Sequence, residues 1–317
     1  MAAAGCFFTP LLVAAGPRWS NGEDLHVSPE IVFSPIDSWL RIPSILEATR
    51  VNKYWHVINI GIQNTLTYRV NFLFRAAFGL IPLAATIFLW RTIYAGKTVD
   101  DVAGYTLAGM TSYYLLVTVM DALTAVTEDD WQIAADIKDG NISQFLLKPI
   151  DYLTYRLCLF GAGRMIYTAF ATIPVGIFIY CFRGYFEAPV SATAFGCFAV
   201  SVVLTALLQF FISYTMALLA FWVTEVSTFI FILFAFEYIA GGHLFPLNIL
   251  PPWVEQILSF TPFPYLLYFP ISVYLGKVTG PALWSGLAVH AFWVMAAYLM
   301  ARCVWSRGIK KYSAVGG

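Results

Sequence analysis

Long apolar stretches separated by short polar ones constrain this sequence more than any other feature. A stretch of about 18 or more apolar residues is long enough to cross the hydrocarbon core of a membrane as a helix. We therefore predict an all-α polytopic membrane protein. Its six transmembrane helices are expected over residues 70–94, 103–126, 152–182, 190–222, 226–242 and 281–305.

The composition excludes an ordinary soluble domain. Hydrophobic residues make up 60% of the 317 residues and charged residues only 11%, whereas soluble domains carry roughly 25% charged residues. So few charged side chains could not cover a globule in water. The net charge is zero, so nothing in the charge balance indicates a nucleic-acid partner, and we expect none.

Two segments precede the first expected span. Residues 1–15 are mildly apolar and residues 16–40 hold prolines and glycines among polar residues, and we expect residues 1–40 to form a loosely ordered leader. In residues 41–68, apolar side chains such as Tyr54, Ile58 and Ile62 recur at helical spacing. This pattern predicts an amphipathic connecting helix in the membrane interface. A soluble helix packed on another domain would show the same pattern. Residues 69–317 then form the transmembrane domain.

Residues 243–276 are apolar but cannot form one straight helix, because they contain prolines at six positions: Pro246, Pro251, Pro252, Pro262, Pro264 and Pro270. Irregular backbone at membrane depth is tolerated only where protein buries it or where it lines a cavity. We therefore predict short re-entrant helices on the external face.

Lysine and arginine residues set the expected orientation, since they favour the cytoplasmic side. With the N-terminus inside, twelve basic residues lie inside and four outside. The inner set is Arg41, Arg50, Lys53, Arg69, Lys138, Lys148, Arg156, Arg164, Arg302, Arg307, Lys310 and Lys311, and the outer set is Arg91, Lys97, Arg183 and Lys277. Both termini are therefore predicted to be cytoplasmic.

The longest inner loop, residues 127–149, contains a predicted helix. Asp129 and Asp130 follow Thr127, and acidic residues stabilise a helix start. Gly140 is a typical stop. The loop thus presents a short charged helix to the cytoplasm. The pattern by itself also fits an ordinary surface helix, and its carboxylates point in scattered directions, so we expect no metal site.

Two motifs resemble a known family. The loop carries I..DI..G.IS..LLKP, and the stretch after the fifth span carries GG..FPL..LPPW...I....PF.YL.Y.PI.VYLGK. Over residues 43–312, the sequence resembles the type-two ABC exporter permeases. It is most similar to the viologen-exporter-like subgroup of the ABC-2 family transporter proteins.

This resemblance implies a permease of an ATP-driven exporter in the inner membrane of a bacterium. It moves a hydrophobic or amphipathic substrate out of the cytoplasm by alternating access. The implied partners are two cytosolic ABC ATPase subunits and a second permease, either an identical copy or a paralogue. ATP and Mg²⁺ would bind to the ATPase subunits.

The resemblance also implies two groups of site residues. The residues implied in coupling to the ATPase lie in the loop over residues 127–149. They are Asp129, Asp130, Asp136, Ile137, Gly140, Leu146, Leu147 and Pro149. The residues implied in an external gate lie in and just before the predicted re-entrant region. They are Gly241, Gly242, Pro246, Pro251, Pro252, Trp253 and Pro262.

Ionisable residues inside expected spans are candidates for function. Glu237, near the expected outer end of the fifth span, and His243 just after it are candidates for the substrate path. Glu237 could equally pair with His243 or reach the outer interface. For Arg75 and Asp121, we expect the side chains to extend to the inner interface.

Other chemistry finds no support in the sequence. Gly96, Lys97 and Thr98 resemble the end of a phosphate-binding loop, but Arg91 stands where the first glycine is required. We therefore expect this chain to bind no nucleotide or other cofactor itself, and to have no catalytic residues. Two alternatives stay open, an ATP-independent secondary transporter and a polytopic lipid-modifying enzyme.

Overall fold

The computed structural model describes residues 42–67, 69–96, 102, 104–126 and 129–312, with no side chains for 42–52, 69 and 129. The leader predicted over residues 1–40 lies outside this part. The chain divides into two compact units, Met1–Ala48 and Thr49–Gly317. Only the beginning of one helix is described in the first unit, so all that follows concerns the second.

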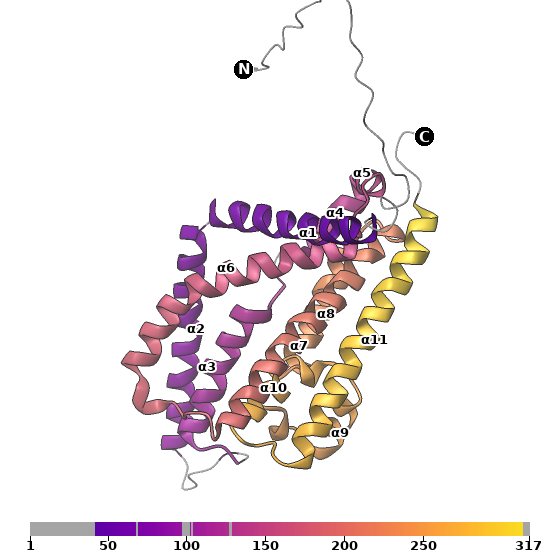
Figure 1. Ribbon diagram of the computed structural model, residues 1–317. Coiled ribbons are helices and arrows are strands. Elements are labelled where there is room, and N and C mark those ends of the chain that lie inside the picture. The colour runs from indigo at the N-terminus through magenta and orange to yellow at the C-terminus, as the bar shows by residue number, and fades with distance from the viewer. Residues whose placement is uncertain (1–41, 68, 97–101, 103, 127–128, 313–317) are drawn as a thin grey trace, which may run out of the picture. The chain divides into compact units, whose positions relative to one another are not determined.

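The described residues form helices and short turns, with no strand among them (Figure 1). This confirms the predicted all-α polytopic fold. The helices are α1 (Ile42–Thr67), α2 (Arg69–Ala95), α3 (Leu107–Thr124), α4 (Asp129–Lys138), α5 (Ile142–Leu146), α6 (Tyr152–Cys181), α7 (Ala192–Ala217), α8 (Ser227–Ala240), α9 (Pro252–Ser259), α10 (Tyr268–Tyr274) and α11 (Pro281–Lys311).

Five described helices are long and apolar enough to cross a membrane: α2, α3, α6, α7 with its following turn, and α11. The stretch expected to form the fifth of six spans contains α8, which has only 14 residues. At 1.5 Å per residue it is about 21 Å long, shorter than the roughly 30 Å hydrocarbon core. The count of six spans therefore stays a prediction.

Contacts between distant segments define the two ends of the helix bundle. At one end, which we call the α4 end, Arg302 of α11 meets Asp151 at 2.6 Å, and the Tyr312 hydroxyl donates to the Gly140 carbonyl at 3.1 Å. The loop containing α4 and α5 therefore lies beside the last turns of α11.

The opposite end is held by a second set of contacts. The Thr106 hydroxyl donates to Glu187 at 3.0 Å, and Lys277 donates to the carbonyl of Gly104. The starts of α3, α7 and α11 therefore gather there. Because α7 ends at the α4 end, the segment from α8 to α10 connects the two ends of the bundle.

From Thr49 onward, α1 runs crosswise to α2 and α3 (Figure 1). It packs on α6 through Gly61, where a Cβ atom would lie 3.1 Å from both Leu159 and Ala162. A glycine is thus what allows the two backbones to approach so closely.

Two buried apolar clusters hold the bundle together. One joins α3 to α10 near the opposite end, with Tyr113 and Ile271 fully buried. The other joins α4, α6, α7 and α11 at the α4 end, with Ile142 and Tyr214 fully buried. The segment between α8 and α10 therefore packs on α3, while α4 packs on α7.

Candidate functional site

The chain reverses sharply just after α8, at Gly241 and Gly242. Gly242 has φ +95°, and a Cβ atom there would lie 2.7 Å from the Tyr113 hydroxyl. A Cβ at Gly241 would lie 2.7 Å from the carbonyl oxygen of Glu237. Both positions therefore require glycine, since any side chain would move the turn away from its neighbours.

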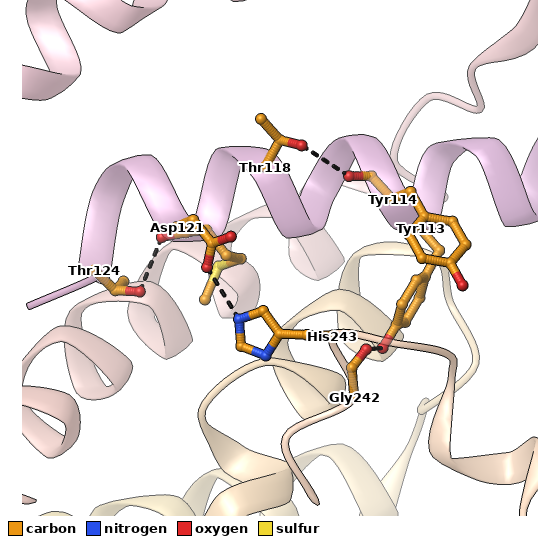
Figure 2. Close-up of polar contacts among 8 residues, drawn as sticks. Tyr113, Tyr114, Thr118, Asp121, Thr124, Gly242 and His243 are labelled. Atoms are coloured by element: carbon orange, nitrogen blue, oxygen red, sulfur yellow. Dashed lines mark hydrogen bonds and ion pairs between the residues drawn. The ribbon is translucent and has the colours of Figure 1, made fainter. Parts of the chain in front are cut away.

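Helix α3 holds this turn with hydrogen bonds to its backbone (Figure 2). The Tyr113 hydroxyl donates to the Gly242 carbonyl at 2.6 Å, and the Tyr114 hydroxyl donates to the Leu244 carbonyl at 2.6 Å. These bonds satisfy two carbonyl groups of the turn that follows α8, where the backbone forms no helix. The turn is therefore fixed to the side of α3.

An ion pair adds a third contact between the same two segments. His243 Nε2 lies 3.1 Å from Asp121 Oδ1 (Figure 2). The imidazole ring also stacks on Tyr238, with ring centroids 4.9 Å apart and an interplanar angle of 19°. The Asp121 side chain is 50% exposed and the His243 side chain 14%, so the pair lies at an accessible surface.

Glu237 is buried, with 7% of its surface exposed, and Gln209 of α7 and His243 lie near its carboxyl. The ion pair of His243 is formed with Asp121 rather than with Glu237. The structure thus gathers Asp121, Gln209, Glu237 and His243 from three helices and one turn.

The position of this group differs from the expectation. Glu237 and the double glycine were expected at the outer end of a full span, and Asp121 was expected to extend alone to the inner interface. Instead the turn lies along the length of α3, between Tyr113 and Asp121. The reason is the shortness of α8, which ends before it has crossed the bundle.

A cavity of about 1010 Å³ lies next to the turn. It is bounded by α2, α3, α6 and α8, and along α2 it extends from Arg75 to Trp90, about 22 Å at helical rise. Its wall is aromatic and apolar with a few charged side chains. The aromatic members are Trp90, Tyr114, Trp131, Tyr167, Phe231, Phe234, Tyr238 and Phe245, and the charged ones are Arg75, Asp121, Asp130 and Arg164.

The other expected gate residues lie beyond the turn. Pro246 is buried and precedes a short 3₁₀ turn. Pro251 caps α9 and Pro252 is its first residue, as proline at a helix start favours. Trp253 is 65% exposed, and Pro262 precedes the turn that leads to α10. These residues lie at turns and helix starts within residues 243–276 and do not line the cavity.

The helix expected in the loop over residues 127–149 is present as α4, and its apolar side packs on the bundle. Ile133, Ile137 and Ile142 are buried against the ends of α6, α7 and α11. Ile137 was assigned to coupling by resemblance, and its 4% exposure shows that it faces the bundle. Its side chain therefore attaches the helix to the bundle.

The polar residues of this segment make structural contacts as well. Asp136 accepts a hydrogen bond from the Tyr152 hydroxyl at 2.7 Å. Gly140 ends α4 with φ +77°, a conformation that favours glycine. Asp130 accepts from the amide of Trp131 at 2.9 Å and borders the cavity, whereas the side chain of Asp129 lies outside the described part.

The exposed surface of the segment includes large apolar side chains among polar ones. Trp131 is 48% exposed, Leu146 53% and Leu147 87%, and Pro149 next to them is exposed too. Large apolar side chains exposed together outside the expected spans are typical of a protein-binding surface.

Sequence reasoning found part of this site. It singled out Glu237, His243 and the double glycine, but not Tyr113, Tyr114 or Gln209. No local signal marks these side chains, since aromatic and amide residues inside a span usually pack on neighbours. Among the described residues, no three His, Cys, Asp or Glu side chains come together as a metal site would require.

The long apolar helices define the class, a multi-pass membrane protein. The family model described as ABC-2 family transporter protein matches residues 80–316. The chain therefore belongs to this family. It is a membrane transport permease component of an ABC transporter rather than an enzyme, and the family implies ABC ATPase partners. No curated protein matches the sequence.

Proposed function

We propose that this chain is the permease of an ATP-driven exporter, and that the cavity between α2, α3, α6 and α8 is part of its substrate path. An amphipathic substrate fits the mixture of aromatic and charged side chains along the wall. Alternating access then consists of rigid-body movement that opens the cavity to one side of the membrane at a time.

The observation that carries this proposal is the turn at Gly242 and His243. It is irregular backbone held against the middle of α3, and it borders the cavity. In membrane proteins such backbone is found where it is buried in protein or lines a water-filled space. This turn is packed against α3 and also borders the cavity, and a transport path is the function that requires backbone of this kind.

Two cytosolic ABC ATPase subunits are the proposed partners at the α4 end, and ATP and Mg²⁺ bind to them. Support comes from the exposed apolar residues of the loop, Trp131, Leu146 and Leu147. Because Ile133 and Ile137 anchor α4 in the bundle, a force applied to the loop reaches α7 without passing through a flexible joint.

A second permease, identical or paralogous, is the proposed partner of α3 and α8. Most of α8 is exposed, including Phe231, Phe234 and Tyr238, and Asp121 is half exposed on the same side of the cavity. A charged side chain inside a span is stable only where protein or water covers it. A partner helix over this face supplies that cover.

In this proposal the protein lies in the inner membrane of a bacterium, with both termini and the α4 end in the cytoplasm. The clustering of Lys53, Lys148, Arg302 and Lys311 near that end supports the orientation. The re-entrant segment then faces the outside.

Copurification tests the proposal. The detergent-solubilised chain should bring down an ABC ATPase, and inside-out vesicles should take up a fluorescent amphipathic dye when ATP is added. Leu147→Glu should reduce ATPase recovery about tenfold because it places a charge in the apolar contact. Phe260→Glu is the matched control, since Phe260 is 81% exposed outside the loop. Full recovery of the ATPase with Leu147→Glu would contradict the docking surface.

One observation favours a second candidate, a proton-coupled secondary transporter. Asp121, Glu237 and His243 are ionisable groups that lie close together between α3 and the end of α8, with Glu237 buried, and proton-coupled transport requires ionisable groups within the membrane domain. Dye uptake that persists without ATP and stops when the proton gradient is dissipated would favour this candidate.

A further inference from the structure

Asp151, between the α4–α5 loop and α6, joins three segments and has no role in the cavity or the docking surface. Its Oδ2 accepts the amide of Thr154 at 3.0 Å and the Thr154 hydroxyl at 2.7 Å, which caps the start of α6. Its Oδ1 meets Arg302 Nη1 of α11 at 2.6 Å. One carboxylate thus holds the start of one long helix and the last third of another.

The loop beside Asp151 is also attached to α1. Lys53 Nζ donates to the carbonyl of Pro149 at 2.6 Å, and the amide of Asp151 lies 3.4 Å from the Tyr54 hydroxyl. A movement of the loop at Pro149 therefore moves Asp151 together with the connecting helix.

The contact between Asp151 and Arg302 is ionic but open to water. Partial burial raises the pKa of Asp151, but the hydrogen bonds from Arg302 and Thr154 outweigh this and lower it overall. The carboxylate is therefore charged at neutral pH. The two side chains are 35% and 42% exposed, so water screens the pair, and such a contact can break and re-form.

Helix α11 carries this contact across the bundle. It runs without interruption from Pro281 to Lys311, and Arg302 lies about 31 Å along the helix from Pro281 at 1.5 Å per residue. A displacement at Arg302 therefore reaches the opposite end, where α11 begins, as a rigid-body movement.

We propose that the Asp151–Arg302 pair is the joint that transmits movement of the ATPase-contacting segment, residues 129–149, to α11. This inference rests on the proposed function. Asp151 acts through Arg302 and touches no substrate, so it is a positioning residue. Spatial connection alone does not demonstrate coupling, and the test therefore measures movement and hydrolysis separately.

The experiment uses the permease with its ABC ATPase in nanodiscs. The native cysteines are replaced by serine, and Trp284→Cys, at the far end of α11 and 63% exposed in the parent, reports movement. The readout is the change in its maleimide labelling rate on adding ATP, Mg²⁺ and vanadate. Phosphate release measures hydrolysis.

Asp151→Asn separates the two roles of Asp151, because asparagine caps helices as well as aspartate but carries no charge. Arg302→Met removes the pair and leaves the cap intact. Arg307→Met is the control, since the Arg307 guanidinium contacts Cys303 of its own helix, at 2.9 Å, and forms no ion pair within the described part of the chain.

Asp151→Asn and Arg302→Met should each reduce the nucleotide-dependent change in labelling at least fivefold, with hydrolysis within twofold of the parent and complex recovery unchanged. In the double variant, the nucleotide-dependent change in labelling should be reduced no further than in either single variant. Arg307→Met should behave as the parent. If the Asp151→Asn variant fails to assemble with the ATPase, the result for Arg302→Met alone decides whether the inference holds.

An unchanged nucleotide response in Arg302→Met would overturn the inference and leave the proposed function intact. An equal reduction of the labelling change in Arg307→Met would also overturn the inference, because the effect would then not be specific to the Asp151–Arg302 pair. A parent that hydrolyses ATP without any change at position 284 would show that α11 does not move. Failure to recover any ABC ATPase with the parent would overturn the proposed function and this inference with it.

Discussion

Replacing Gly242 by alanine tests the turn beside the cavity. The residue has φ +95°, a backbone region that residues with a Cβ atom rarely adopt. The new Cβ would also lie 2.7 Å from the Tyr113 hydroxyl and 3.3 Å from Tyr268 Cβ. The turn must therefore move, and the hydrogen bond from Tyr113 to the Gly242 carbonyl is stretched or lost.

Two contributions set the magnitude. Forcing a non-glycine residue into the left-handed region costs about 1–2 kcal/mol. Losing a buried hydrogen bond that leaves its partners unsatisfied costs about 1–3 kcal/mol. We expect a loss of about 2–5 kcal/mol in the free energy of unfolding. At about 2 °C per kcal/mol for a large domain, the melting temperature should fall by roughly 4–10 °C.

The assay is thermal unfolding of the detergent-solubilised protein followed by intrinsic fluorescence, with Tyr113→Phe as a second variant. Without the hydroxyl, the new Cβ has more room and the hydrogen bond is already gone. Gly242→Ala should therefore cost only the conformational part, about 1–2 kcal/mol, in the Tyr113→Phe background. Gly163→Ala is the control, because nothing lies within 4 Å of a Cβ there.

Two results would refute this reasoning. If Gly242→Ala changed the melting temperature no more than Gly163→Ala does, the turn would not require glycine. If Gly242→Ala had the same effect in both Tyr113 backgrounds, the contact with the hydroxyl would contribute nothing.

Three further predictions follow from contacts elsewhere. Asp121→Asn and His243→Gln should each lower the melting temperature slightly, and the double variant should lower it no further, because both remove the same pair; additive losses would contradict this. Gly61→Leu should destabilise the protein by about 1–3 kcal/mol, since its side chain enters the contact between α1 and α6, and an unchanged melting curve would refute that. Leu147→Glu should leave the melting temperature within about 1 °C of the parent, because the side chain is 87% exposed; a larger fall would show that Leu147 supports the fold.

Local patterns in the sequence predicted much of the helical structure. Acidic residues and Gly140 marked the two ends of α4, and the structure places it at Asp129–Lys138. Paired prolines marked the start of α9, which begins at Pro252. Such signals are local, since capping and proline sterics act within one helical turn.

The assignment of roles within the site was less predictable. Ile137 was assigned to the coupling region because its motif resembles one, and the structure adds that its side chain is buried against α7 and neighbouring helices. Which face of a short helix is buried depends on what packs against it. The packing partners of α4 lie far along the chain, so no local pattern names them.

The sequence by itself determined that this chain lies in a membrane, that it is helical, and that a broken segment follows its fifth apolar stretch. Long apolar runs and proline positions decide these properties without reference to any other part of the chain. Only the tertiary structure decided where that segment turns and what it meets. His243 reaches Asp121 across 122 positions because α8 ends before crossing the bundle and α3 lies beside its end. Contacts of that kind depend on helix packing, and packing brings together residues that share no local pattern.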